Sequence, residues 1–150
     1  MTKRDLTLVA ITVAVMCIPL AIVAHKNQQA EMTSSVFDWT TIPVKPTKTG
    51  ESRAFFQAPT PTLDELECHV TTLHPGESPH APHKHPDEEL VIIKEGIVES
   101  LVNGVVKRVG PGSVIFQSSN QLHSIKNVGT TQATYHVIKW KTAKTPKTGN

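Results

Sequence analysis

Short apolar runs separated by turn residues fill the chain from residue 53 onward. After residue 31, no stretch keeps a helical period of apolar positions long enough to predict a helix, apart from a single turn at 61–67. The pattern therefore predicts an all-β domain, a sandwich or barrel of many short strands. The expected strands are 53–57, 66–73, 90–94, 97–102, 105–109, 114–117, 123–126 and 134–140.

Three dipeptides mark turns between these runs. Asn103-Gly104 separates two apolar runs and predicts a two-residue β-hairpin, because these residue types tolerate the positive φ angles of such a turn. Pro111-Gly112 and Val128-Gly129 predict further turns.

The stretch before the barrel, residues 31–51, is polar and is punctuated by Thr, Pro and Lys. It predicts a linker with at most one short strand, at 36–42. Phe37 and Trp39 are two residues apart, so in an extended chain they share one face. We expect this face to pack against the barrel.

The N-terminal residues have the pattern of a targeting segment. Lys3 and Arg4 precede a run of 19 residues without charge, 6–24, and polar residues follow it. This run predicts an N-terminal hydrophobic helix that acts as a signal peptide or as an uncleaved transmembrane anchor; a buried core helix is the weaker alternative. Basic residues before the run favour export of the rest of the chain, to a periplasmic or extracellular location.

Composition removes one class of partner. The net charge is +2, and the chain has no run of Arg and no aromatic RNA-binding motif. We therefore expect no nucleic-acid partner. The two cysteines, Cys17 in the leader and Cys68 in an expected strand, are too few for a disulfide framework, and Cys68 is predicted to be a small buried hydrophobe.

Residues 76–96, GESPHAPHKHPDEELVIIKEG, concentrate the chemistry of the chain. His83 and His85 are two residues apart, so in extended backbone they project to one face. Glu89 follows four residues after His85, where the next apolar run begins. Two imidazoles and a carboxylate make a partial metal shell. The missing ligand must come from elsewhere, and His123, with Asn127 four residues beyond it, is the candidate.

Together, these two segments resemble the two motifs of the cupin superfamily. The first family motif is a glycine, H-x-H, three or four residues, a glutamate, six residues and a glycine. The second is a glycine, five residues, P-x-G, two residues, a histidine, three residues and an asparagine. The matching positions here are Gly76, His83, His85, Glu89 and Gly96, then Gly112, His123 and Asn127.

The chain departs from the family pattern in its loops. Gly76 lies one residue further from the first histidine than usual, and Ser118 and Asn120 replace the usual proline and glycine. Asn is the residue that best replaces Gly at positive φ, so we expect the turn at Asn120 to survive.

The resemblance implies a single cupin double-stranded β-helix, a jelly-roll barrel, over residues 60–140. The chain would then divide into a leader at 1–30, a linker or N-terminal strand at 31–59, the barrel, and a disordered tail at 141–150. The resemblance also implies one divalent metal ion, with Mn or Fe favoured and Zn, Ni or Cu open. Its ligands would be His83, His85, Glu89 and His123.

The resemblance defines the function less narrowly than the fold, because this superfamily includes several classes of enzyme and simple binding proteins on one scaffold. We expect a metal-dependent enzyme of the oxygenase type, a dioxygenase-like oxidoreductase, acting on a small organic molecule. The alternative is a non-catalytic module that binds or senses a small molecule or the metal. The resemblance also implies a homodimer, with residues 31–57 as a strand for exchange.

For several polar residues, the sequence leaves open whether they lie near this site. Glu88 competes with Glu89, because a slip of one residue in a strand moves a side chain to the other face. The other residues near the site, each with an alternative at the surface, are His69, His80, Gln117, Tyr135, His136 and Arg53.

Overall fold

The computed structural model describes residues 29–147, which contain strands and no helix. The nine strands are β1 (Lys45–Thr47), β2 (Gly50–Ala58), β3 (Glu65–Leu73), β4 (Glu88–Glu95), β5 (Val98–Val102), β6 (Val105–Val109), β7 (Val114–Gln117), β8 (His123–Asn127) and β9 (Ala133–Lys141). The predicted all-β class and all eight predicted strands are confirmed. The predicted hydrophobic helix lies outside the described residues.

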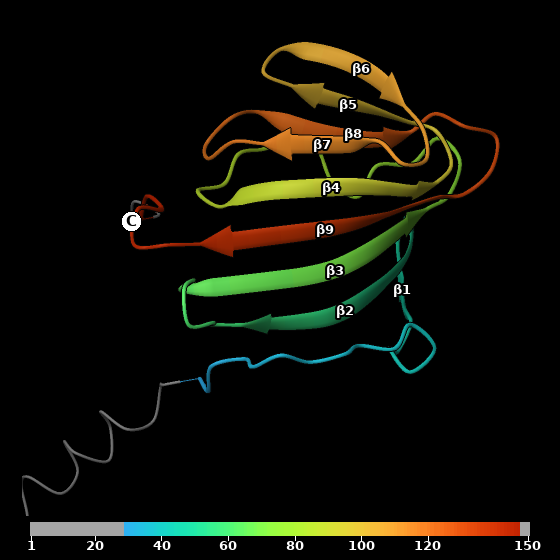
Figure 1. Ribbon diagram of the computed structural model, residues 1–150. Coiled ribbons are helices and arrows are strands. Elements are labelled where there is room, and N and C mark those ends of the chain that lie inside the picture. The colour runs from blue at the N-terminus through green and yellow to red at the C-terminus, as the bar shows by residue number, and fades with distance from the viewer. Residues whose placement is uncertain (1–28, 148–150) are drawn as a thin grey trace, which may run out of the picture. The chain divides into compact units, whose positions relative to one another are not determined.

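The strands form two antiparallel sheets of the jelly-roll type (Figure 1). The larger sheet has the order β1-β2-β3-β9-β4-β7, and the smaller has the order β6-β5-β8. Their facing sides enclose the core, because alternate residues of each strand point to the same side. The buried core residues are Leu73, Val91, Ile93, Val98, Ile115, Ile125, Ala133, Tyr135 and Val137.

Two predicted turns are confirmed by their backbone angles. Asn103 and Gly104 have φ angles of 49° and 78°, and they join β5 to β6 with Val102 paired to Val105. Two successive positive φ angles are what a tight hairpin of this kind requires. Asn120 also has a positive φ, 58°, so asparagine does replace glycine in the turn that precedes β8.

The strand predicted at 36–42 is absent. Asp38 accepts hydrogen bonds from the backbone N–H and the hydroxyl of Thr40, both at 2.8 Å. This side chain-to-backbone turn bends the chain, so an extended strand cannot form there. These hydrogen bonds also lower the pKa of the Asp38 carboxyl.

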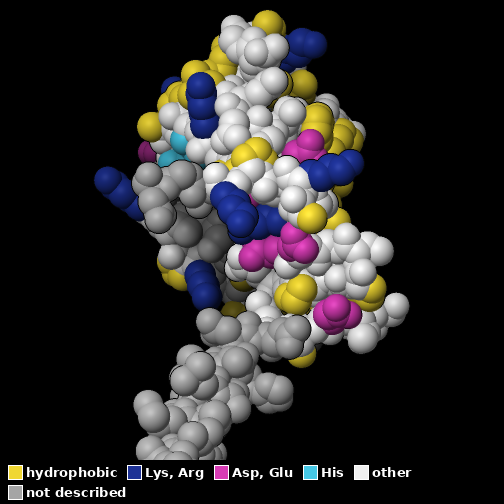
Figure 2. Space-filling model, turned by 90° about the vertical axis from the view of Figure 1, so that its left-hand side faces the viewer, with side chains coloured by type: hydrophobic (Ala, Val, Ile, Leu, Met, Phe, Trp, Pro, Cys, Tyr) yellow, Lys and Arg dark blue, Asp and Glu magenta, His cyan; other side chains and the backbone are white. Residues whose placement is uncertain are grey.

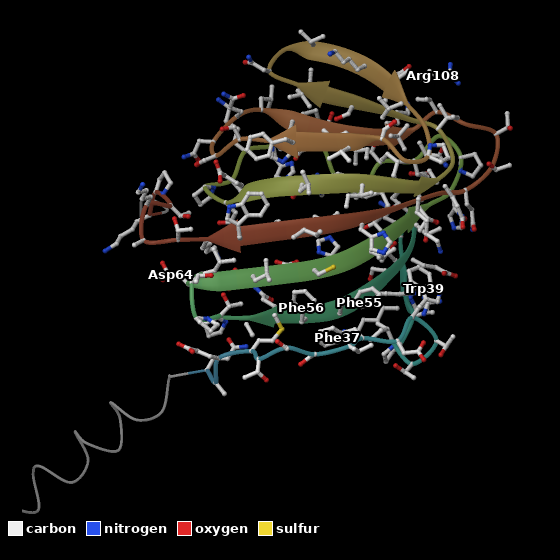
Figure 3. All side chains as sticks on the ribbon, viewed as in Figure 1. Phe37, Trp39, Phe55, Phe56, Asp64 and Arg108 are labelled. Atoms are coloured by element: carbon white, nitrogen blue, oxygen red, sulfur yellow. The ribbon has the colours of Figure 1, made fainter. Side chains whose placement is uncertain are left out.

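The aromatic pair of this segment packs as predicted. The rings of Phe37 and Phe56 have centroids 4.9 Å apart, and those of Trp39 and Phe55 are 6.2 Å apart (Figure 3). Residues 36–42 are therefore a strap held on β2 by its side chains rather than by strand pairing.

The chain beyond the barrel is ordered further than its composition predicts. Lys141, the first residue of the predicted disordered tail, ends β9 and lies 2.8 Å from Glu65. A backbone hydrogen bond from Thr145 to Thr142 closes a turn after it. Across residues 29–147, no helix has the length and hydropathy needed to cross a bilayer.

Candidate metal centre

The histidines of the two sequence motifs meet at one end of the sheets. His83 and His123 exchange both backbone hydrogen bonds, with N···O distances of 3.1 and 3.0 Å, and so form an isolated antiparallel bridge. The N–H of Asn120 donates to the carbonyl oxygen of His85 at 2.8 Å. Backbone bonds therefore dock the turn before β8 onto the histidine loop before β4.

The ring nitrogens of this cluster have lone pairs that could bind a cation. Nδ1 of His85 lies 3.0 Å from the carbonyl oxygen of Asp87, and Nδ1 of His123 lies 2.8 Å from that of Gln121. A carbonyl can only accept, so each Nδ1 carries the proton and each Nε2 keeps a lone pair. Both Nε2 atoms are buried without a hydrogen-bond partner, as is Nδ1 of His83.

These three histidines form a group whose potential ligand atoms lie within 4.8 Å of one another. Buried polar atoms rarely remain unpartnered, so three of them this close together indicate an absent ligand. Three neutral imidazoles suit a divalent first-row metal ion. The residues present therefore fit the metal that the sequence motifs imply.

Glu89, the predicted fourth ligand, lies beside this group. Its Oε2 is 3.4 Å from Nε2 of His85, and its side chain is largely buried. Glu88, the competing carboxylate, instead accepts a hydrogen bond from the indole N–H of Trp140 at 3.0 Å. The alternation of β4 thus turns Glu89 toward the histidines and Glu88 away from them.

Burial keeps two of these imidazoles, those of His83 and His123, in the neutral form. Burial, followed by the nearby His80, His123, His85 and Lys139, lowers the pKa of His83 to about 4. Burial also lowers the pKa of His123, against the opposing effects of the Gln121 carbonyl and Glu89. At neutral pH both rings are therefore uncharged, which is the state that binds metal.

A cavity of about 190 Å³ opens beside the three histidines. Its lining residues belong to strands and loops whose ends lie at the left in Figure 1, and Figure 2, which looks onto these ends, shows a small patch of histidine surface. Gln117 and Tyr135, both predicted near the mouth, line the cavity and are each 2% exposed. Tyr135 has a raised pKa because it is buried, so its hydroxyl stays protonated.

A hydrogen-bonded network on β3 and β9 forms part of the cavity wall. Glu67 lies 2.7 Å from Nδ1 of His69 and 3.0 Å from Nζ of Lys139. Lys139 and His69 both line the cavity. Of these three, only His69 stands out in the sequence. Alternation within each run could have placed Glu67 beside His69, but the pairing of residue 67 with residue 139 appears only in the folded sheet.

Three other residues predicted near the site take different places. His80 lines the cavity but is exposed, and it is outside the group of three histidines. His136 lies among aromatic rings, 6.2 Å from Trp39. Arg53 donates to the carbonyl oxygen of Ile42 at 2.7 Å and covers the Trp39 ring. His136 and Arg53 therefore belong to the packing of the strap on the sheet.

Three larger depressions, of about 630, 680 and 380 Å³, lie elsewhere on the described surface. None of them contains any of the three grouped histidines, and the first is lined mainly by residues 141–147. The smallest cavity is the functional candidate, because it alone of these four adjoins the unpartnered ring nitrogens.

A family model described as a cupin domain matches residues 69–139, which span β3 to β9 and include all four predicted ligands. The barrel of this chain is a cupin domain. The fold expected for this superfamily is thus confirmed, whereas the ligand assignment within it stays a prediction.

Solved structures share this cupin fold at low sequence identity. An RmlC-like cupin from Shewanella frigidimarina is 17% identical over 78% of this chain and 96% of its own, with a TM-score of 0.60. A predicted oxalate decarboxylase from Thermotoga maritima is 22% identical over 71% of this chain and 99% of its own, with a TM-score of 0.58.

The polyketide cyclase RemF from Streptomyces resistomycificus is 19% identical over 73% of this chain and 80% of its own, with a TM-score of 0.58. No curated protein matches the chain. At these identities the likeness shows the fold, and the site itself must carry any argument about function.

Proposed function

We propose that this cupin is a metal-dependent enzyme of the oxygenase type that acts on a small organic molecule. One divalent ion would be held by His83, His85, His123 and Glu89. The observation that carries the proposal is the convergence of buried, unpartnered ring nitrogens on one small cavity.

The donor set limits the identity of the metal ion but does not define it. Three imidazoles and one carboxylate suit Mn²⁺ or Fe²⁺, and they also bind Zn²⁺, Ni²⁺ and Cu²⁺. When bound, such an ion supplies a Lewis acid or a redox centre with positions left for a ligand.

The residues of the chain itself define what can enter. The cavity of about 190 Å³ is smaller than the roughly 300–1,000 Å³ of pockets that bind drug-sized ligands, so it suits a small substrate. Val137 and Ile125 give it apolar walls, while Thr71 and Gln117 provide hydrogen-bonding groups. This mixture positions a small polar molecule and limits bulk water around it.

Metal analysis of the purified protein tests the proposal. We expect about one equivalent of Mn or Fe per chain, and loss of this metal in His83→Ala and His123→Ala. His74→Ala is the control, since His74 is exposed and does not line this cavity, and it should keep its metal. A parent protein that stays metal-free after reconstitution would contradict the proposal.

Turnover separates the enzyme from the alternative of a binding or sensing module. O₂ consumption with a panel of small organic acids and alcohols is expected only for the loaded parent protein. A compound that raises the melting temperature but is never converted would favour the binding module.

Two properties outside the site belong to the same proposal. Residues 6–24 would export the barrel or anchor it in a membrane, and cell fractionation of the full chain tests this. Two copies would form a homodimer through residues 31–57, and sedimentation as a monomer would contradict it.

A further inference from the structure

A row of polar side chains crosses the inner face of the larger sheet. Glu67 pairs with Lys139, Lys139 with Glu89, and Glu89 with Gln117, on the neighbouring strands β3, β9, β4 and β7. Directly paired residues of adjacent strands point to the same side of a sheet. The row therefore runs beneath the metal-binding histidines, with Lys139 between two carboxylates.

Lys139 is the cation of this row, and it keeps the capacity to bind a ligand. Its contact with Glu67, at 3.0 Å, engages one of the three N–H donors of an ammonium group. Its side chain is about one-quarter exposed and lines the cavity. Glu67 also holds His69 at 2.7 Å, so the carboxylate fixes both neighbours at the cavity wall.

The charges of the row define the charge of a suitable ligand. Within the row, Glu67 and Glu89 contribute two negative charges and Lys139 one positive charge, a sum of −1, and histidines that ligate a metal add no charge because they bind it in the neutral form. A divalent ion raises this sum to +1. A monoanion then brings the site to neutrality, whereas a neutral ligand or a dianion leaves one net charge in a partly buried site, which is costly.

Gln117 is a second, independent sign of a missing ligand. Its side chain is 2% exposed and lines the cavity, and its Oε1 atom has no hydrogen-bond partner. An amide oxygen only accepts, so its partner must supply a donor, such as a hydroxyl group.

We propose that this row is the recognition subsite for a small organic monocarboxylate, with Lys139 as its anion contact. The inference rests on the proposed metal centre, because the divalent ion makes the site cationic. It adds the class of ligand, which neither the fold nor the histidines define.

Ligand binding to the Co²⁺-loaded protein tests this subsite without any assumption about turnover. Glycolate carries a carboxylate and a hydroxyl in a molecule that the cavity can hold, and glycolamide is its neutral counterpart. Calorimetry gives the dissociation constants, and the visible absorption of Co²⁺ reports whether the ligand reaches the metal. We expect glycolate to bind at least about tenfold more tightly than glycolamide.

Four variants separate charge from structure. Lys139→Met should weaken glycolate binding about tenfold or more with Co²⁺ still bound, whereas Lys139→Arg should retain most of it. Glu67→Gln removes a negative charge and should tighten glycolate binding, the opposite sign to Lys139→Met. Lys107→Met is the matched control, since Lys107 is exposed on β6 and does not line this cavity.

The possible results are distinct. Equal affinity for glycolate and glycolamide, or glycolate binding unchanged in Lys139→Met, would overturn the subsite and leave the metal centre standing. Weaker binding in both Lys139→Met and Glu67→Gln would also overturn it, because that result indicates a structural role. Failure of the protein to bind Co²⁺ would overturn both proposals.

Discussion

Asn127, the last residue of β8, is joined to Leu73, the last residue of β3, by a hydrogen bond of 3.0 Å from its Nδ2 to the Leu73 carbonyl oxygen. The same Nδ2 donates to the carbonyl oxygen of Thr131 at 2.8 Å, and Oδ1 accepts from the N–H of Gly129 at 3.0 Å. Asn127 is fully buried. It therefore fastens the smaller sheet to the larger one, at the strand ends opposite the metal centre.

Asn127→Ala should destabilise the protein by about 3 kcal/mol, because three hydrogen bonds are lost and buried carbonyl groups stay unpaired. Urea unfolding measures this change. Metal bound per folded molecule should not change, since no atom of Asn127 reaches the cavity. The exposed neighbour Thr130, changed to Ala, should cost less than about 0.5 kcal/mol. Equal losses for the two variants would contradict the role given to Asn127.

Adjacent carboxylates provide a second test, because β4 turns them to opposite faces. Glu89→Gln should lower metal affinity at least about tenfold, since an amide is a much weaker ligand for a divalent ion than a carboxylate. Glu88→Gln should leave metal affinity unchanged, because Glu88 is bonded to Trp140 instead. Competition with a chelator gives both affinities. The reverse order would mean that β4 is shifted by one residue.

The metal-free protein should lose stability as the pH falls from about 6.5 toward 4. Burial lowers the pKa of His83 from its ordinary value of 6.5 to about 4, so within this window the unfolded chain binds a proton that the folded chain does not. Stability therefore rises with pH across the window, and the loss is complete below the folded pKa. The pKa values of His123 and His136 are lowered in the same direction, also by burial.

Urea unfolding at a series of pH values measures this slope, with a chelator present throughout. His83→Gln should flatten the slope without abolishing it, because His123 and His136 still contribute. A slope unchanged by His83→Gln would show that the His83 imidazole titrates alike in the folded and unfolded chains.

Local patterns in the sequence predict most of this fold, and long-range pairing supplies what they miss. Alternation and turn residues predict eight strands and the Asn103-Gly104 hairpin, because both depend on neighbours along the chain. The strand expected at 36–42 fails for a local reason, the turn that Asp38 makes with Thr40.

The candidate site divides in the same way. His83 and His85 share a face through their spacing, and the motif resemblance brings in His123 and Glu89. The sequence does not predict a role for Lys139, because no residue near it in the chain belongs to the site motifs. Its role appears only when β9 pairs with β3 on one side and β4 on the other.

Gly96, which follows β4, offers a final test. The effect of its backbone angle on stability can be separated from the effect of its close neighbours. Its φ is 81°, and a Cβ atom there would lie 2.6 Å from the carbonyl oxygen of Gln132 and from Cα of Ala133. Gly104 has nearly the same φ, 78°, but a Cβ atom there would have no neighbour within 4 Å.

Gly104→Ala should therefore cost only the strain of a left-handed residue, about 1 kcal/mol. Gly96→Ala should cost about 2–4 kcal/mol, because the backbone of residues 132 and 133 must also move away from the new methyl group. Urea unfolding of both variants gives the difference, which isolates the close approach from the strain. If the two variants lose the same stability, the chain before β9 can yield at this point, and Gly96 is required for its backbone angle alone.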